Sequence, residues 1–229
     1  MLQKLKPKAK IAFIVGLIIA FGLFFRVGLD KFFYEESDRA ITPPIDATDE
    51  ADRLIQTASQ NFFYHEFDQA VENYKKAIVL FEKRENFKRA ARTYESIGDI
   101  YKFSNNSNEA EKAYLLAVDY HHKLHDKIGE GRAMKRVGEF YMQNSRLDEA
   151  AEWFSKATVI VQNAEPHVVK AKIYEAQGRY LIKTKQTLEA LNSFQKAKDT
   201  YDKIGYPLGY DNISPMIEKL KRLQKNKLS

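Results

Sequence analysis

The chain has 229 residues, of which 44% are hydrophobic and 30% are charged, and its formal net charge is +6 at pH 7. The excess positive charge lies in residues 1–10 and 217–229, because residues 48–216 hold 25 basic and 25 acidic side chains, and this neutral middle lacks the basic stripe that binding to nucleic acid requires. The absence of cysteine excludes disulfides, thiolate chemistry and a lipid anchor on an N-terminal cysteine.

The first predicted element is a transmembrane helix over residues 11–29, preceded by a basic tail over residues 1–10. Residues 11–25 are uncharged, and the apolar run continues once the long side chain of Arg26 extends toward the lipid headgroups. A bilayer requires roughly 17–25 such residues. The lysines of the tail predict a cytoplasmic N-terminus and an exported domain after the helix. Residues 30–49, which contain two adjacent prolines, are expected to form a tether.

A cleaved signal peptide is the alternative interpretation of the apolar segment. Residues 20–22 resemble a cleavage site, but they lie inside the apolar run, and this position favours retention of the helix. Ala12, Gly16 and Ala20 form a strip of small residues on which another transmembrane helix could pack, although small residues are common in such helices anyway.

After the tether, a triplet of small, aromatic and small residues recurs four times at intervals of 40 residues. Gaps of four and three residues place each triplet on one face of a helix, where small side chains beside a ring let a neighbouring helix approach closely. The triplets are Ala70-Tyr74-Ala77, Ala110-Tyr114-Ala117, Ala150-Phe154-Ala157 and Ala190-Phe194-Ala197. A constant interval of this kind indicates an array of helical repeats.

A second marker with helical spacing precedes each of the later triplets, and its glycine removes a side chain where two helices cross. Each repeat is therefore expected to consist of two helices joined by a polar turn. The markers are Tyr94, Ile97, Gly98 and Tyr101, then Met134, Val137, Gly138 and Tyr141, then Tyr174, Gln177, Gly178 and Leu181, and the turns lie at 104–108, 144–146 and 185–187.

Together the two markers resemble the tetratricopeptide repeat (TPR) family over residues 50–205. The resemblance implies an all-α fold, a right-handed superhelix of tandem helix-turn-helix repeats, in four units over about 51–90, 91–130, 131–170 and 171–210. The period exceeds the usual length of about 34 residues, and the extra residues are expected to lengthen the second helix or the link onward. The pattern is similar to a long-repeat branch of the family and to the soluble membrane-fusion adaptors built from long helical pairs.

Residues 211–229 are expected to form a capping helix and a basic tail. Ile217, Leu220 and Leu223 lie on one helical stripe that could cover the open edge of the fourth repeat, while the lysines between them meet water. The basic face is interpreted as a solvated surface, with contact to anionic lipid as the alternative.

The resemblance places a partner-binding groove along the first helices of the repeats. Arg132 and Arg136, one turn apart, are similar to the basic pair with which some family members bind a C-terminal carboxylate, but the accompanying asparagines are absent. Salt bridges between neighbouring helices are the alternative interpretation. The groove candidates are Arg92, Glu95, Asp99, Lys102, Arg132, Lys135, Arg136, Glu139, Lys172, Glu175 and Arg179.

A second candidate contact surface lies at the first turn, where Phe62, Phe63 and Tyr64 are followed closely by Phe67. Four rings so near one another in the sequence cannot all face a core, so some are expected to meet a partner or a membrane. Packing beneath the tether is the alternative. Trp153, the only tryptophan, is expected to pack between repeats.

No motif of an enzyme is present, neither a phosphate-binding glycine loop nor a nucleophile elbow nor a metal-hydrolase motif. His121 and His125 share a helix face as paired metal ligands do, but two imidazoles are too few, and cationic histidines also suit a helix C-terminus. We therefore predict no metal, no cofactor and no small-molecule substrate.

The combined prediction is a single-pass, membrane-anchored TPR scaffold that binds proteins and assists the assembly or organisation of a membrane protein complex. Its partners could include a transmembrane helix of that complex. A chaperone-like receptor for exported or unfolded chains and a permanent structural subunit are the two alternatives, and the step from a repeat fold to a role is one of analogy.

Overall fold

The computed structural model describes residues 49–228, which belong to the compact unit Asp46–Ser229. The predicted transmembrane helix 11–29, the basic tail and nearly all of the tether lie outside the described residues. The same holds for the predicted packing strip of Ala12, Gly16 and Ala20. Among the described helices, none is both long enough and apolar enough to cross a membrane.

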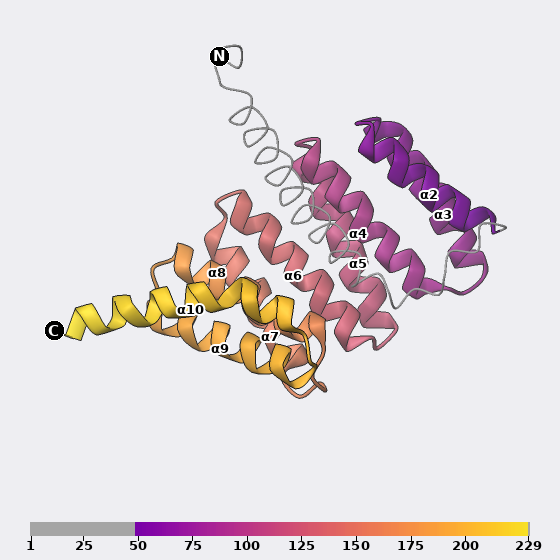
Figure 1. Ribbon diagram of the computed structural model, residues 1–229. Helices are drawn as coiled ribbons and strands as arrows, with labels where there is room; N and C mark the ends of the chain where they lie inside the picture. Colours follow the sequence, from indigo (N-terminus) through magenta and orange to yellow (C-terminus); the bar gives the residue numbers. More distant parts are fainter. Residues whose placement is uncertain (1–48, 229) are drawn as a thin grey trace, which may run out of the picture. The chain divides into compact units, whose positions relative to one another are not determined.

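Residues 49–228 form helices joined by short links, stacked in chain order (Figure 1). The helices are α2 (Glu50–Phe63), α3 (Phe67–Lys83), α4 (Phe87–Phe103), α5 (Ser107–Lys123), α6 (Lys127–Gln143), α7 (Leu147–Val161), α8 (Val168–Lys183), α9 (Thr187–Lys203) and α10 (Pro207–Leu228). Four helix-turn-helix pairs, from α2–α3 to α8–α9, are followed by α10. This part of the chain is a TPR-like repeat array, and its pairs begin one to four residues before the expected units.

Most links have three residues, and the middle one adopts a left-handed backbone conformation. These residues are His65, Glu85, Asn105, His125, Ser145, Lys185 and Gly205. A residue with a left-handed backbone ends the helix that precedes it. In two links the residue after it caps the following helix, because Asn86 accepts a hydrogen bond from the Arg89 amide and Asp126 accepts one from the Gly129 amide. The chain therefore turns sharply and identically after almost every helix.

The two helices of a pair cross where the sequence places glycine. A Cβ atom added at Gly98 would lie 2.6 Å from the Tyr114 ring, closer than any real packing contact. The same pairing recurs between Gly138 and Phe154 and between Gly178 and Phe194. The eight alanines of the four triplets are completely buried. The expected helix crossing is confirmed, and the marker residues form the core.

The extra length of each repeat lies in both helices. The expectation that it lengthens only the second helix or the link is corrected, because α5 continues past Ala117 to Lys123, a three-residue link follows, and α6 then begins at Lys127, well before the marker residue Met134. The additional residues are thus divided between the end of one helix and the start of the next, and they extend the packed surface on both sides of the link.

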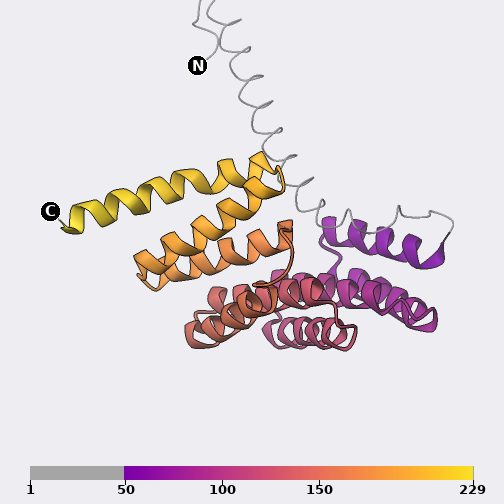
Figure 2. The ribbon, with the colours of Figure 1, turned by 90° about the horizontal axis from the view of Figure 1, so that it is seen from below.

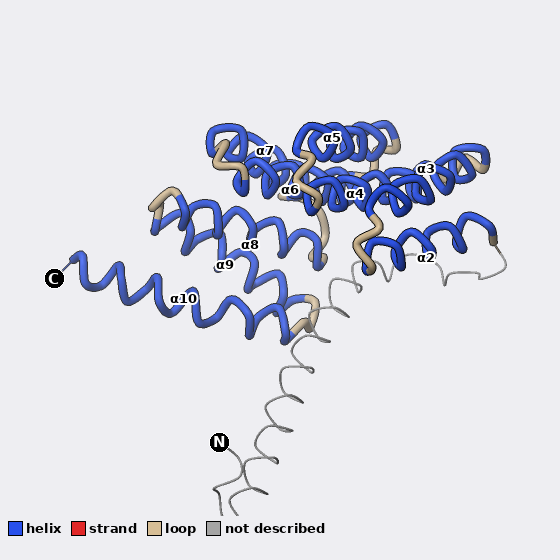
Figure 3. The backbone as a smooth tube through the Cα atoms, turned by 90° about the horizontal axis from the view of Figure 1, so that it is seen from above, coloured by secondary structure: helices blue, strands red, loops and turns tan. Residues whose placement is uncertain are grey.

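The helices form two layers in the middle of the array. In Figure 3, α5 and α7 lie in one layer and α4 and α6 in the next. The link from α7 to α8, residues 162–167, is longer than the others and has no left-handed residue. Lys170 holds this link by donating from Nζ to the carbonyl oxygens of Gln162 and Ala164 at 2.8 and 2.6 Å.

The last helix covers the end of the array, as Figure 2 shows for α8, α9 and α10. Ile213, Ile217 and Leu220 are buried in a cluster with side chains of α9. Two details of the expected cap are corrected. The helix begins at Pro207 rather than residue 211, and Leu223 is 46% exposed because α10 extends beyond the surface that α9 offers.

Candidate functional site

The predicted groove contains a buried ion network centred on Glu95 of α4. Arg132 of α6 binds the Glu95 carboxylate through Nε at 3.0 and 3.2 Å and through Nη2 at 2.9 Å. Glu95 is only 3% exposed and Arg132 only 8%. These two groove candidates are corrected to structural residues, because their charges already satisfy each other and are closed off from a partner.

Arg136 extends the same network toward the surface. Its Nε donates to Glu95 at 2.9 Å, and its Nη1 donates to Asp99 at 2.6 Å. Asp99 also accepts from the Tyr114 hydroxyl at 2.6 Å, and Lys102 lies 3.4 Å away. Both arginines of the proposed carboxylate clamp therefore make the cross-helix salt bridges that the sequence offered as the alternative.

A histidine that is completely buried joins this network from α5. His121 Nε2 lies 3.2 Å from Glu95, and its Nδ1 lies 3.4 Å from Asp126 in an ion-pair contact that lacks hydrogen-bond geometry. Burial alone would lower the pKa of His121, but the Asp126 and Glu95 carboxylates outweigh burial and raise it. A Cβ at Gly129 would lie 2.2 Å from His121 Nδ1, so this glycine makes room for the imidazole.

The carboxylates of the network are held in their charged form. Burial would raise the pKa of Glu95, yet Arg132, His121 and Arg136 together bring that pKa well below its usual value. Glu95 and Arg132 stand 37 positions apart, and so do Asp99 and Arg136. Asp52 and Arg89 repeat this offset in an ion pair between α2 and α4. An acidic residue followed 37 positions later by an arginine is the sequence signal that identifies such pairs.

The remaining groove candidates are partly exposed, and several are also paired. Lys135 and Glu139 lie 2.9 Å apart, and Arg179 and Glu175 lie 2.6 Å apart. Arg92 and Lys172 are half-buried on α4 and α8. The groove face thus offers charges that are largely compensated within the chain, which leaves little net charge for a partner.

The histidines do not assemble a metal site in the described part of the chain. His121 is occupied by the ion network, and His122 lies 3.0 Å from Glu130. Within residues 49–228 there is no group of three or more side chains of the ligand types placed to hold a metal ion. Trp153 is partly buried against the core of the middle repeats, with Lys156 Nζ 4.6 Å from its ring centre.

An exposed group of rings surrounds the first turn, and we call it the aromatic patch. Its members are Phe62, Phe63, Tyr64, His65, Phe67 and Phe103. Phe63 is 73% exposed, Tyr64 69% and Phe103 59%. Phe103 comes from the end of α4, and its ring centre lies 5.7 Å from that of Phe62 and 5.9 Å from that of Phe67. Phe62, Phe67 and Phe103 thus contact one another across two repeats, while Phe63 and Tyr64 contact each other beside them and are open to solvent.

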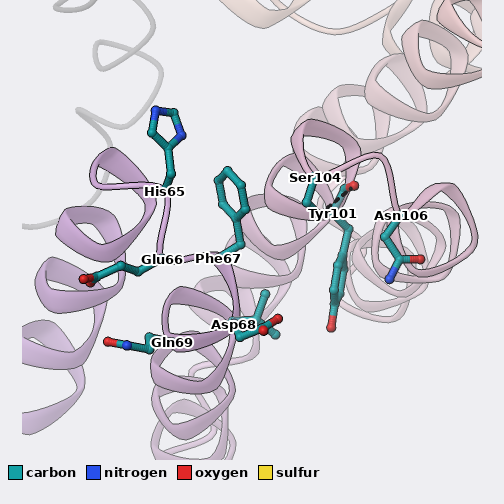
Figure 4. A pocket seen from close by; sticks show the side chains of 9 residues that line it. His65, Glu66, Phe67, Asp68, Gln69, Tyr101, Ser104 and Asn106 are labelled. Atoms are coloured by element: carbon teal, nitrogen blue, oxygen red, sulfur yellow. Dashed lines mark hydrogen bonds between the residues drawn. The ribbon is translucent and has the colours of Figure 1, made fainter.

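A cavity of about 470 Å³ adjoins the aromatic patch. Figure 4 shows Phe67 and Asp68, at the start of α3, on one side and Tyr101, Ser104 and Asn106 on the other. Asp68 is exposed and points toward Tyr101. The lining of the cavity is mixed, because Phe67 and Val71 are apolar whereas Asp68, Ser104 and Asn106 are polar. Sequence reasoning identified Phe62, Phe63 and Tyr64 but missed Phe103 and the cavity, because Phe103 belongs to the next repeat.

Comparisons with known proteins agree with this architecture. The profile of the family described as soluble NSF attachment protein, SNAP, matches residues 33–175, more than half of the chain. An alpha-soluble NSF attachment protein of Vitis vinifera is 24% identical over 164 residues, which cover 66% of this chain and 56% of the relative. The chain thus spans little more than half the length of this curated relative.

Among solved structures, the apo form of RapI aligns with a TM-score of 0.64 at 13% identity, covering 86% of this chain and 54% of RapI. At that identity the likeness supports the fold alone. BtubC from P. vanneervenii, with a TM-score of 0.44 and 13% identity over 76% of this chain and 89% of BtubC, is too different in shape to support a conclusion.

Proposed function

The chain belongs to the soluble NSF attachment protein family, SNAP, and on this premise we propose that it is a membrane-anchored adaptor that binds protein partners through its helical repeats. The aromatic patch is the observation that carries the proposal. Clusters of exposed rings are typical of protein contacts, where Tyr, Trp and Phe are enriched relative to the rest of the surface. No catalysis is part of this function.

The patch is a better partner site than the groove for an electrostatic reason. Most groove charges already pair within the chain, and Glu95 and Arg132 are buried. Separating such pairs to bind a partner would leave desolvated charges behind, which is costly. The rings of Phe63 and Tyr64, in contrast, are already exposed and lose only water on binding.

The anchor and its orientation are part of the proposal. Residues 11–29 are apolar enough to span a bilayer, and the lysines before them favour an exported repeat domain. A tether raises the effective concentration of the repeats near other membrane proteins. The adaptor would therefore assist the assembly or organisation of a membrane protein complex, with a chaperone-like receptor or a permanent subunit as alternatives.

Crosslinking in intact membranes, followed by purification of the full-length chain in mild detergent, tests the partner site. The test variant carries Phe63→Ser, Tyr64→Ser and Phe103→Ser, and the matched control replaces three exposed apolar residues elsewhere. The control substitutions are Leu116→Ser, Val159→Ser and Leu188→Ser, at positions 42–59% exposed. Loss of crosslinked partners in the test variant alone supports the patch, and equal recovery in both variants would refute it.

The same experiment separates the three roles by stoichiometry. One partner set at equal abundance indicates a permanent subunit, many chains at low abundance indicate a chaperone-like receptor, and a defined set present only during assembly indicates an adaptor. Protease protection in sealed membranes tests the orientation, since digestion of the repeat domain from the cytoplasmic side contradicts export.

A further inference from the structure

We propose that the aromatic patch and its cavity bind an extended peptide segment in which a Lys or Arg adjoins a large apolar side chain. The inference rests on the proposed function and specifies the chemistry of the partner. The apolar side chain would lie against Phe67 and Phe103, and the cation would lie beside the Asp68 carboxylate in the cavity.

The Tyr64 ring of the patch is not required by the turn that carries it. The links at residues 104–106 and 144–146 have the same left-handed middle residue as the link at residues 64–66, yet they carry Ser104 and Asn144 where the first link has Tyr64. The turn therefore folds equally well with small polar residues. The exposed Tyr64 ring is therefore not dictated by the turn, and its surface is available to a partner.

The charge of the cavity favours a cation. Its lining residues include Asp68 and Glu66 but no lysine or arginine. Within residues 49–228 Asp68 has no ion-pair partner, so its charge is available, whereas Glu66 accepts a hydrogen bond from Asn61 at 2.5 Å and points away from the cavity. A basic side chain at Asp68 would restore neutrality, and its aliphatic stem would contact the neighbouring rings.

The cavity also suits the main chain of a peptide. Ser104 and Asn106 present a hydroxyl and an amide group along its wall, and such groups can donate to and accept from an extended backbone. A membrane surface fits less well, because anionic headgroups attract Lys and Arg, and the lining offers carboxylates instead.

The test uses the full-length chain in mild detergent and a fluorescein-labelled peptide that contains three copies of the sequence Ser-Lys-Phe-Ser. Fluorescence anisotropy is the measurement. Two control peptides replace every Lys by Glu or every Phe by Ser. We expect the parent peptide to bind and both controls to bind at least about tenfold more weakly, as is typical when a central contact is lost.

The chain offers a closely matched control variant for the charge. Asp148 occupies the position of Asp68 two repeats later, is also exposed and stands in the first turn of α7. Asp68→Lys is expected to weaken binding about tenfold, whereas Asp148→Lys should leave it within about twofold, although both make the same change to a helix N-terminus. Equal effects of the two variants, or equal affinity for the acidic peptide, would overturn the inference.

A membrane contact is the competing outcome and has its own readout. Phe63→Trp in proteoliposomes that contain brominated lipids is expected to keep its fluorescence, and quenching beyond that of Trp153 alone would assign the patch to the bilayer and refute the peptide site. If crosslinked partners depend on the patch but the basic peptide does not bind, this inference fails while the proposed function stands. If partner recovery is independent of the patch, the proposed function itself fails.

Discussion

Neutralising Glu95 should destabilise the array more than any exposed charge change. In Glu95→Gln the carboxylate is lost, while Arg132, whose side chain is 9% exposed, stays charged with no anion in contact. Removing one partner of a buried ion pair costs about 3–5 kcal/mol. Arg136 keeps its bond to Asp99, so the loss of Glu95 should cost less at Arg136 than at Arg132. We expect the total loss of stability to lie within that range.

Thermal unfolding of the full-length chain in mild detergent, followed by far-UV circular dichroism, measures the effect. For a chain of this size about 1 kcal/mol shifts the melting temperature by roughly 2–4 °C, so Glu95→Gln should lower it by roughly 6–20 °C. Repeat arrays unfold as coupled neighbours, and a weakened contact between α4 and α6 should also broaden or split the transition. Glu139→Gln, the same change in a partly exposed pair of the same helix layer, should cost less than about 1 kcal/mol.

The double variant Glu95→Met/Arg132→Met distinguishes a buried-charge effect from simple loss of packing. Replacing both partners removes the uncompensated charge, so at least about half of the lost stability should return. The reasoning is refuted if Glu95→Gln melts within about 2 °C of Glu139→Gln, or if the double variant is less stable than Glu95→Gln alone.

Three further predictions concern packing, protonation and the cap. Gly98→Ala should destabilise the array by about 1–2 kcal/mol, because the added Cβ lies 2.6 Å from the Tyr114 ring. Gly138→Ala, whose Cβ lies 3.0 Å from the Phe154 ring, should be nearly neutral, because the helix preference of alanine, about 1 kcal/mol, offsets the strain. The midpoints of denaturant unfolding compare the two variants. Since the pKa of His121 is raised in the folded state, the melting temperature should fall as pH rises from about 6.5 through that pKa, and His121→Gln should flatten this slope in a pH series of melts. Ile213→Asp, at a fully buried position of α10, should release the cap, seen as faster hydrogen exchange in α9 and α10, and unchanged exchange would show that the cap is not needed.

The repeat core could be predicted from sequence because its determinants are local. Ala110, Tyr114 and Ala117 fall on one helical face by spacing alone, and all three are buried. Gly98 likewise marks its helix crossing without further information. Such residues make their contacts within one helix pair, where residues that are close in sequence are also close in space.

The ion network could not be predicted in the same way, because its partners come from three helices. Glu95 looked like a surface residue beside a marker, and only the positions of His121 and Arg132 show that it is buried. The aromatic patch was predicted in part, since Phe62 and Tyr64 lie two positions apart in sequence, but Phe103 reaches Phe62 across the boundary between repeats. Side chains that serve contacts between repeats carry no local pattern, which is why they were misassigned or missed.

The six-residue link between α7 and α8 gives the array one joint of a different kind. Elsewhere each helix is followed by the same three-residue turn, so the angle from one pair to the next is set by a repeated part. At residues 162–167 that angle depends instead on a longer backbone segment and on Lys170, whose Nζ donates hydrogen bonds to two carbonyl oxygens of this segment. Insertions or deletions here should change the angle at which α8, α9 and α10 together continue the array, against the resistance of the packing of Val161 on Val169 and Ile173 across the link.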